Sequence, residues 1–409
     1  MALAQPDLNK DEHGNRGTCP MSPTPGVPWR LLAASALAQA VVFLLRPAAS
    51  YEALALGAPV SSLGVLSAAF AVAPLVLALP LGRAVDRFGE KRTMIVGTSG
   101  IVVTTVLFLV GPDRFSTVVW STALLGAAHL GCIVGQQAMM ANGYASARLD
   151  AMFGYYTFAA SLGQALGPLV IAVLGGGSAT PPTRPIFLVS LALTVLLLAV
   201  TLAVPGGRAG REPGPAPRGA GGIGGLLRTP GVPQALATSA MVLAAVELTV
   251  VYLPALGAER GLSASAVGVL LTVRALASMA SRLLLSQLID LMGRNRLLVV
   301  SLLVSAAAFM ATPVPMPALV LTAVVAALGL GLGVGQPVTM AWLGRAAPEG
   351  QRGQAMSVRL GANRLGQFLI PPLLGTVAAG LGAGGVLWAL AAGLGATTLL
   401  LRPASRRRG

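Results

Sequence analysis

Long uncharged apolar stretches alternate with short charged ones along the 409-residue chain. A membrane-spanning helix needs about 20 apolar residues, so most of these stretches hold one span, and the longest holds two around a Pro-rich turn. Because the bilayer core offers no water to the backbone, such stretches form helices. The pattern predicts an all-α integral membrane protein. The clearest stretches are 53–82, 115–147, 151–183, 297–344 and 365–401.

Twelve transmembrane helices are predicted from these segments. They lie near 29–51, 58–81, 93–111, 116–140, 152–175, 185–204, 231–255, 264–287, 297–312, 318–341, 355–379 and 384–401.

The charge of the chain supports a membrane location. Only 10% of the residues are charged and the mean hydropathy is +0.78, whereas soluble domains carry about 25% charged residues. A net charge of +15 could indicate a nucleic-acid partner. However, most of the 28 Lys and Arg residues fall in segments on one side of the predicted membrane. By the positive-inside rule we expect a multi-pass plasma-membrane protein with both termini cytoplasmic and no nucleic-acid partner.

Several short blocks recur in the same order at nearly constant spacing, which predicts an internal repeat. We therefore expect two six-helix bundles at 29–204 and 231–402, joined by a flexible cytoplasmic linker at 205–230. A disordered tail at 1–28 and a basic tail at 403–409 flank them. Two bundles with the same orientation in the membrane predict a substrate path between them and transport by alternating access. The recurring blocks include GVL at 64–66 and 268–270, VGQ at 134–136 and 334–336, and LGQALGP at 162–168 with LGQFLIP at 365–371.

One charged stretch, GRAVDRFGEKR at 82–92, interrupts the apolar pattern. It resembles the signature between the second and third helices of the major facilitator superfamily, G-x-x-x-D-R-x-G-[RK]-[RK]. Glu90 stands where that signature usually has a base, and the second-half copy keeps Asp290 and Gly293. The resemblance implies the twelve-helix fold of that superfamily and a transport function, without a substrate. The matching residues are Gly82, Asp86, Arg87, Gly89 and Lys91.

We expect this loop to act as a conformational latch between the halves. Gly82 and Gly89 would let helix ends turn sharply. Asp86 can accept from a neighbouring Arg and face the positive N-terminus of a helix in the other half. The alternative is a solvated basic loop that only orients the protein, and it stays open for Arg83, Lys91 and Arg92. The latch candidates are Gly82, Asp86, Arg87, Gly89, Lys91, Arg92, Asp290 and Gly293.

The predicted fifth helix carries Gly154, Gly163, Gly167 and Pro168 in GYYTFAASLGQALGP. This spacing resembles the antiporter motif of the drug/proton branch of the superfamily, without its closing Gly pair. The resemblance implies proton-coupled export, whereas the small residues by themselves predict a flat face for close helix packing. That branch also tends to carry an Arg in its fourth helix, where this chain offers His129.

Ionisable groups at membrane depth are costly and mark functional sites. Arg46, Glu247, Arg274 and Arg364 lie in the first, seventh, eighth and eleventh predicted spans. Glu247 aligns in the repeat with Phe43, and Arg46 follows three residues later on the same face. In the superfamily that the chain resembles, the first and seventh helices face each other, which makes an Arg46–Glu247 pair one placement. In the alternative placement, the side chain of Arg46 extends to the outer lipid headgroups.

We expect Glu247 to carry the coupled proton. The Arg residues favour a substrate with a carboxylate or phosphate, because the guanidinium presents a fork of donors to such groups. For Arg274 and Arg364, hydrogen bonding to backbone carbonyls is the alternative. The other candidates at similar depths are His129, Asn363, Gln136 and Gln336.

These features predict a secondary active transporter that acts on a small molecule in the lipid bilayer as a monomer. The leading hypothesis is proton-coupled export of a small organic compound, with an anion as one candidate. Uptake of an organic acid or sugar-like solute is the alternative, and a non-transporting receptor is a third. No G-x-x-x-x-G-K-[ST] loop occurs, and two His with two Cys make no metal or nucleophile constellation. We therefore expect no enzyme activity, no cofactor and no metal, with a proton gradient as the driving force.

Overall fold

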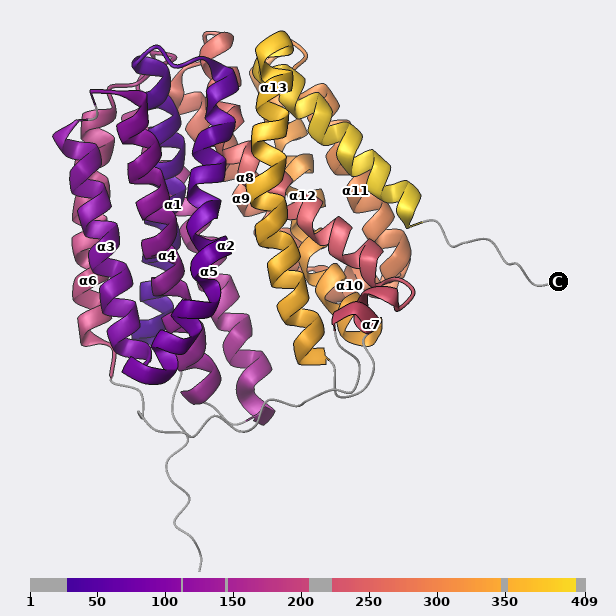
Figure 1. Ribbon diagram of the computed structural model, residues 1–409. Coiled ribbons are helices and arrows are strands. Elements are labelled where there is room, and N and C mark those ends of the chain that lie inside the picture. Colours follow the sequence, from indigo (N-terminus) through magenta and orange to yellow (C-terminus); the bar gives the residue numbers. More distant parts are fainter. Residues whose placement is uncertain (1–27, 112, 144–145, 206–222, 347–351, 402–409) are drawn as a thin grey trace, which may run out of the picture.

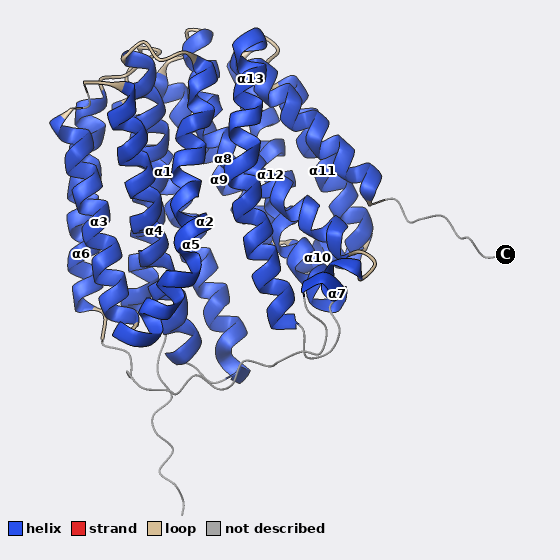
Figure 2. Ribbon diagram, in the orientation of Figure 1, coloured by secondary structure: helices blue, strands red, loops and turns tan. Residues whose placement is uncertain are grey.

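The computed structural model describes residues 28–111, 113–143, 146–205, 223–346 and 352–401, and this part of the chain is helical without strands (Figures 1 and 2). Nearly all of both predicted tails and most of the predicted linker lie outside the described residues.

The first half contains six long helices. They are α1 (Trp29–Ala55), α2 (Leu63–Phe88), α3 (Glu90–Val110), α4 (Phe115–Gly143), α5 (Ser146–Leu174) and α6 (Thr183–Ala203), with a 3-10 turn, η1 (Val60–Ser62), before α2.

The second half repeats this arrangement with two additional short helices. It contains α7 (Ile223–Arg228), α8 (Val232–Glu259), α9 (Ala264–Leu283), α10 (Leu285–Met292), α11 (Arg294–Ala311), α12 (Ala318–Ala346) and α13 (Arg352–Leu400). In the described residues, 11 helices are long and apolar enough to cross a membrane.

Helix α13 supplies two spans. Its 49 residues would extend about 74 Å as one helix, about two and a half times the hydrocarbon thickness of a bilayer. Gly382 interrupts the helix with φ 63° and ψ −165°, and the chain turns back there (Figure 1). The break lies between the predicted spans 355–379 and 384–401, so α13 holds the eleventh and twelfth spans.

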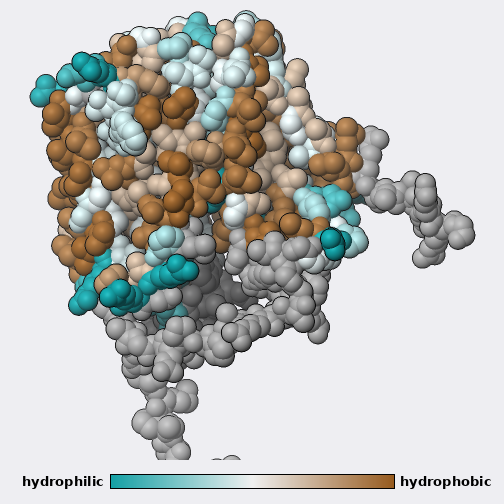
Figure 3. Space-filling view, in the orientation of Figure 1, coloured by the Kyte–Doolittle hydropathy of each residue, from teal (hydrophilic) through white to brown (hydrophobic). Residues whose placement is uncertain are grey.

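The molecule has two distinct ends. At the end here termed the linker end, α6 stops and α8 starts; the opposite end is termed the loop end. Hydrophobic residues cover the face between the ends and hydrophilic residues gather at the ends (Figure 3). This distribution matches a bundle whose middle lies in hydrocarbon.

The repeated GVL blocks mark two places where the halves meet backbone to backbone. Gly64 in α2 packs on α13, and a Cβ there would lie 2.4 Å from the carbonyl oxygen of Pro371. Gly268 in α9 packs on α5, and a Cβ there would lie 2.3 Å from the backbone nitrogen of Ala172. Only glycine permits such an approach. These contacts, termed the loop-end seams, close the molecule at the loop end.

Backbone hydrogen bonds reinforce the seam between α5 and α9. The amide of Ala264, the first residue of α9, donates to the carbonyl of Ser178 at 2.8 Å. In the other seam, Gly375 of α13 lies against the carbonyl of Ser61, which a Cβ would approach to 2.6 Å. The two seams are thus related by the same repeat that the sequence shows.

A second repeated device fixes the loop end within each half. Glu52, near the end of α1, accepts a hydrogen bond from the hydroxyl of Thr183, the first residue of α6. Glu259, at the end of α8, accepts from the backbone N–H of Ala383 at 2.9 Å, directly after the break at Gly382. A carboxylate at the start of a helix satisfies free N–H groups and complements the helix dipole.

Candidate functional site

Arg46 in α1 and Glu247 in α8 form a salt bridge between the two halves. Nη1 of Arg46 donates to Oε2 of Glu247, and Nη2 donates to its backbone oxygen at 3.5 Å. The side chain of Arg46 is 3% exposed and that of Glu247 is 15% exposed. Arg46 therefore faces the partner half rather than the headgroups, and the side chain of Glu247 is the less buried of the two.

An aromatic residue supports this guanidinium from the first half. Cζ of Arg46 lies 4.5 Å from the ring centroid of Phe70 in α2, which is a cation–π contact. The ring of Phe70 in turn lies 5.8 Å from that of His129 in α4. His129 is thus packed behind Phe70, and its buried Nε2 has no hydrogen-bond partner among the described residues.

Arg274 in α9 occupies the position that Phe70 occupies in α2. Their carbonyl oxygens make matching contacts: a Cβ on Gly126 would lie 2.1 Å from that of Phe70, and one on Gly329 would lie 2.3 Å from that of Arg274. The same place in the two halves therefore carries an apolar ring in one and a cation in the other. This difference makes the site asymmetric in charge.

Arg274 is deeply buried and incompletely paired. It is 2% exposed, and its Nε and Nη2 have no hydrogen-bond partner among the described residues. Its charge is attracted by Glu247 and repelled by Arg46. A buried cation of this kind costs free energy unless an anion compensates it.

Helix α13 adds a third cation. Nη1 of Arg364 donates to Oε1 of Gln367 at 2.9 Å, and its charge is attracted by Glu247. Beside it, Asn363 is 4% exposed, and its Oδ1 has no partner among the described residues. Arg46, Glu247, Arg274 and Arg364 are termed the central cluster. It holds three guanidinium groups and one carboxylate, so it is net positive when Glu247 is ionised.

The two repeated glutamines do not join the central cluster. In the first half, Tyr156 donates to Oε1 of Gln136 at 3.2 Å, and Gln136 Nε2 donates to Cys132 Sγ at 3.3 Å. In the second half, Gln336 Nε2 donates to the carbonyl of Ser239 at 2.9 Å and Oε1 accepts from Arg359 at 2.5 Å. Each of these contacts of the two glutamines stays within one half.

The latch candidates are only partly visible. The side chain of Asp86 lies outside the described residues. Gly82 lies inside α2, so the expected turn there is wrong; the chain turns at Gly89, with φ 88°, and again at its repeat mate Gly293, with φ 73°. Among the described residues, the one salt bridge is Arg46–Glu247. The exposed Asp290 therefore forms no salt bridge with a described residue.

The basic residues of that loop are at the surface, and its unusual acid is not. Arg87 and Arg92 are exposed, and Lys91 is half-buried. Glu90 is 6% exposed and accepts from Nδ2 of Asn142 at 2.7 Å. The departure from the superfamily signature therefore ties the start of α3 to the end of α4.

The glycines of the fifth-helix motif do not share one face. A Cβ on Gly163 would lie 2.0 Å from the carbonyl of Ala36, and one on Gly167 would lie 2.5 Å from that of Ala40. These two glycines pack α5 on α1, the helix that carries Arg46. Gly154 has no atom within 4 Å of the place for a Cβ. Pro168 is buried in the same helix.

Sequence reasoning did not single out Arg282, which also connects the halves. Its Nη1 donates to Oγ of Ser161 in α5 at 2.9 Å. Arg282 stands near the linker end of α9, where basic residues usually orient the protein. The signal that could have found it is its place inside the apolar run ASMASRLLL.

Comparison with known proteins decides the family. The chain matches the Major Facilitator Superfamily over residues 31–246 and 235–409. It belongs to this superfamily. This superfamily member is therefore a multi-pass membrane transporter, and no feature of the match indicates catalysis.

One curated relative and several solved structures resemble this transporter. Over 119 residues it is 29% identical to "Efflux pump azaK" of Aspergillus niger. The matched segment covers 29% of this chain and 24% of that pump. The match thus spans about a quarter of the relative.

The solved structures resemble most of the chain at low identity. The nucleoside transporter NupG has a TM-score of 0.70 at 13% identity, with 92% of this chain and 98% of that chain covered. The peptide transporter POT gives 0.73 at 16% identity, covering 92% and 94%. The D-xylose-proton symporter gives 0.72 at 14% identity, covering 92% and 98%. These likenesses show the two-bundle fold.

Proposed function

We propose that this superfamily member transports a small organic anion together with a proton, and that both bind at the central cluster. The observation that carries the proposal is the buried guanidinium of Arg274, whose Nε and Nη2 have no hydrogen-bond partner among the described residues.

The central cluster suits an oxyanion. Arg presents planar, paired donors that match a carboxylate or phosphate. Arg274 has two such donors available, and Arg364 is half-buried with one nitrogen engaged by Gln367. An anion between them would receive hydrogen bonds and offset the positive charge.

Glu247 couples the anion to a proton by simple electrostatics. When Glu247 is ionised it holds Arg46 and offsets one positive charge. A proton on Glu247 removes that negative charge and frees Arg46, so the site attracts an anion more strongly. By linkage, the bound anion strengthens proton binding at Glu247 to the same degree. Proton and anion therefore bind cooperatively, as co-transport in one direction requires.

Cooperative binding favours uptake. A proton gradient directed into the cell would carry the anion with it, which corresponds to the organic-acid alternative from the sequence. We place the linker end, with its basic residues and both termini, on the cytoplasmic side of the plasma membrane. The closed loop-end seams then belong to an inward-facing state of a functional monomer.

Export by proton antiport is the second candidate, favoured by the efflux pump among the relatives and by the fifth-helix glycines. Antiport requires that substrate and proton exclude each other. An anion next to Glu247 would instead strengthen proton binding there. Export through this site therefore needs a neutral or cationic substrate that competes with the proton for the Glu247 carboxylate.

The test measures anion binding to the purified transporter as a function of pH. Small carboxylates and their sulfonate analogues are screened by thermal stabilisation, and a binding sulfonate is used because its own charge does not change near neutrality. The proposal expects tighter binding as the pH falls in the wild type, and tight, pH-independent binding in Glu247→Gln.

Two further results separate the candidates. Arg274→Gln should weaken sulfonate binding by about 10- to 100-fold, whereas Arg296→Gln, at an exposed position in α11, should leave it unchanged. In proteoliposomes, an imposed pH gradient should drive the sulfonate in the same direction as the protons. Binding that tightens as the pH rises, or movement against the protons, would support antiport and overturn co-transport.

A further inference from the structure

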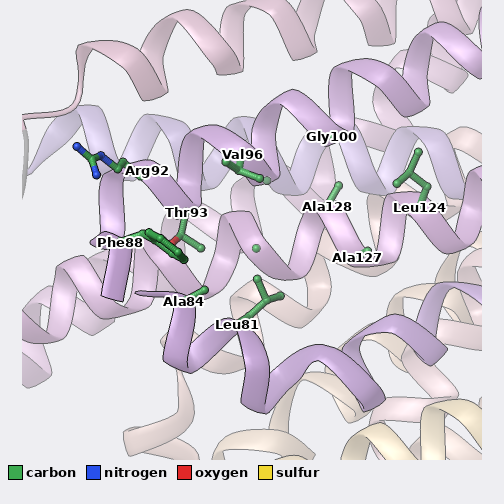
Figure 4. Close-up of a pocket in the computed structure, with 12 residues that line it drawn as sticks. Leu81, Ala84, Phe88, Arg92, Thr93, Val96, Gly100, Leu124, Ala127 and Ala128 are labelled. Atoms are coloured by element: carbon green, nitrogen blue, oxygen red, sulfur yellow. The ribbon is translucent and has the colours of Figure 1, made fainter. Parts of the chain in front are cut away.

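A groove lies on the outer side of the first half, between α2, α3 and α4 (Figure 4). It has a volume of about 560 Å³, and no residue of the central cluster lines it. Val96 and Phe88 on its walls are 73% and 53% exposed. The groove therefore opens sideways, where the bilayer surrounds the bundle.

Small residues make the floor of the groove. Gly97 of α3 contacts α4 so closely that a Cβ would lie 2.3 Å from the backbone nitrogen of Cys132. Gly100 and Ala128 continue this floor, and Leu81 and Phe88 of α2 stand beside it (Figure 4). The trough is apolar and bounded by one helix on one side and two on the other. This shape suits one extended hydrocarbon chain better than a helix, which is about 10 Å wide.

One end of the groove is cationic. Two polar residues line the groove, Thr93 and Arg92. The hydroxyl of Thr93 is already engaged, because it donates to the carbonyl of Gly89 at 3.0 Å. Arg92 is exposed and lies at one end of the groove, with Leu124 toward the opposite end (Figure 4). Arg87 and Lys91 stand nearby in sequence at the same end of the molecule. A ligand with an apolar chain and an anionic head complements this arrangement.

The depth of the groove corresponds to one leaflet. Arg92 stands in the first turn of α3, and Gly100 is about 12 Å farther along the helix axis. One leaflet contributes about 15 Å of hydrocarbon. The groove thus runs from the headgroup region at the linker end to near the middle of the bilayer.

We propose that this groove binds one acyl chain of an anionic phospholipid from the leaflet at the linker end, with the lipid phosphate on Arg92. The guanidinium fork matches phosphate oxygens. The basic residues beside Arg92 raise the local concentration of anionic lipid. The bound chain fills the space between α2 and the α3–α4 pair.

The test compares spin-labelled phosphatidylglycerol with spin-labelled phosphatidylcholine in vesicles of phosphatidylcholine that contain the whole transporter. Electron paramagnetic resonance gives the fraction of each lipid immobilised by the protein. The wild type should immobilise phosphatidylglycerol preferentially. Arg92→Gln should lose this preference, and Arg296→Gln, its repeat mate outside the groove, should keep it.

A second variant tests the groove itself. Ala127→Phe fills the floor and should reduce the immobilised lipid by about one chain per protein for either headgroup, because one chain no longer fits. Val103→Phe, on the exposed face of α3 outside the lining, should leave it unchanged. A preference that survives Arg92→Gln, or an unchanged number of immobilised chains in Ala127→Phe, would overturn the proposal. A dimer that disappears with Ala127→Phe would instead assign the groove to a second copy of the chain.

Discussion

Arg46 of α1 donates a hydrogen bond to Glu247 of α8, so the salt bridge of the described residues joins the two halves rather than stabilising one of them. A salt bridge between bodies that move relative to each other can be present in one conformation and absent in another. The carboxylate of Glu247, whose side chain is partly exposed, is the group through which a proton would control that change.

Replacing Glu247 by Gln should uncouple transport from the proton. The amide keeps the size of the side chain but carries no titratable proton. Gradient-driven accumulation should fall by about tenfold or more, whereas substrate exchange at equal pH should stay within about twofold of the wild type. Both are measured in proteoliposomes, with Asp113→Asn, at an exposed acid outside the helices, as the control. Unchanged driven accumulation would remove Glu247 as the proton site.

Arg274 should contribute to anion affinity in proportion to its donor geometry. Arg274→Gln removes the charge and should raise the dissociation constant of the anion by about 10- to 100-fold, since hydrogen bonds to charged groups contribute about 1.5–3 kcal/mol. Arg274→Lys keeps the charge without the fork, so its affinity should lie between the two. Isothermal titration with the best-binding organic acid measures this order. Equal affinities in all three proteins would exclude Arg274 from the binding site.

The loop-end seams should not tolerate a side chain. In Gly64→Val or Gly268→Val the new atoms would overlap backbone of the other half. Overpacking costs about 1–3 kcal/mol, which corresponds to about 5- to 150-fold in the equilibrium between closed and open seams.

Spin labels at the exposed loop-end residues Leu56 and Leu381 report this opening. The distance distribution should shift to longer values in Gly64→Val and Gly268→Val, and transport should fall. Gly177→Val is the control, because a Cβ at Gly177 meets no atom within 4 Å. Wild-type distances in both seam variants would show that the seams do not restrict the loop end.

Asp86 should bias the opposite end of the molecule if the loop at 82–92 acts as a latch. Asp86→Asn removes the charge that attracts a helix N-terminus or an Arg, so the linker end should open more often. Distances between spin labels at Arg83 and Leu291, both exposed at that end, measure the change. Identical distributions in wild type and variant would leave the loop as an orienting signal only.

Local sequence was sufficient for the helices but not for their partners. The spans follow from apolar length, and even the break between the last two follows from a short gap at 380–383, where Gly382 turns the chain. The repeat placed Arg46 and Glu247 on equivalent faces. Their contact also required that α1 and α8 face each other, which depends on how the halves associate.

Other features lacked a local signal. Glycine is abundant here, with 51 residues, so the sequence could not distinguish Gly64 and Gly268 in the seams from Gly154, which faces open space. Arg282 looked like one more basic residue near a helix end. Its bond to Ser161 appears only when α5 packs on α9.

Hydropathy and the internal repeat by themselves determined that this chain crosses the membrane as two homologous bundles, because burial in hydrocarbon forces backbone hydrogen bonds to be satisfied within each helix. Only the tertiary structure decided which charges meet. Residues far apart in the chain, such as Arg46 and Glu247, interact through space, and close packing of specific glycine faces sets which of them come within reach.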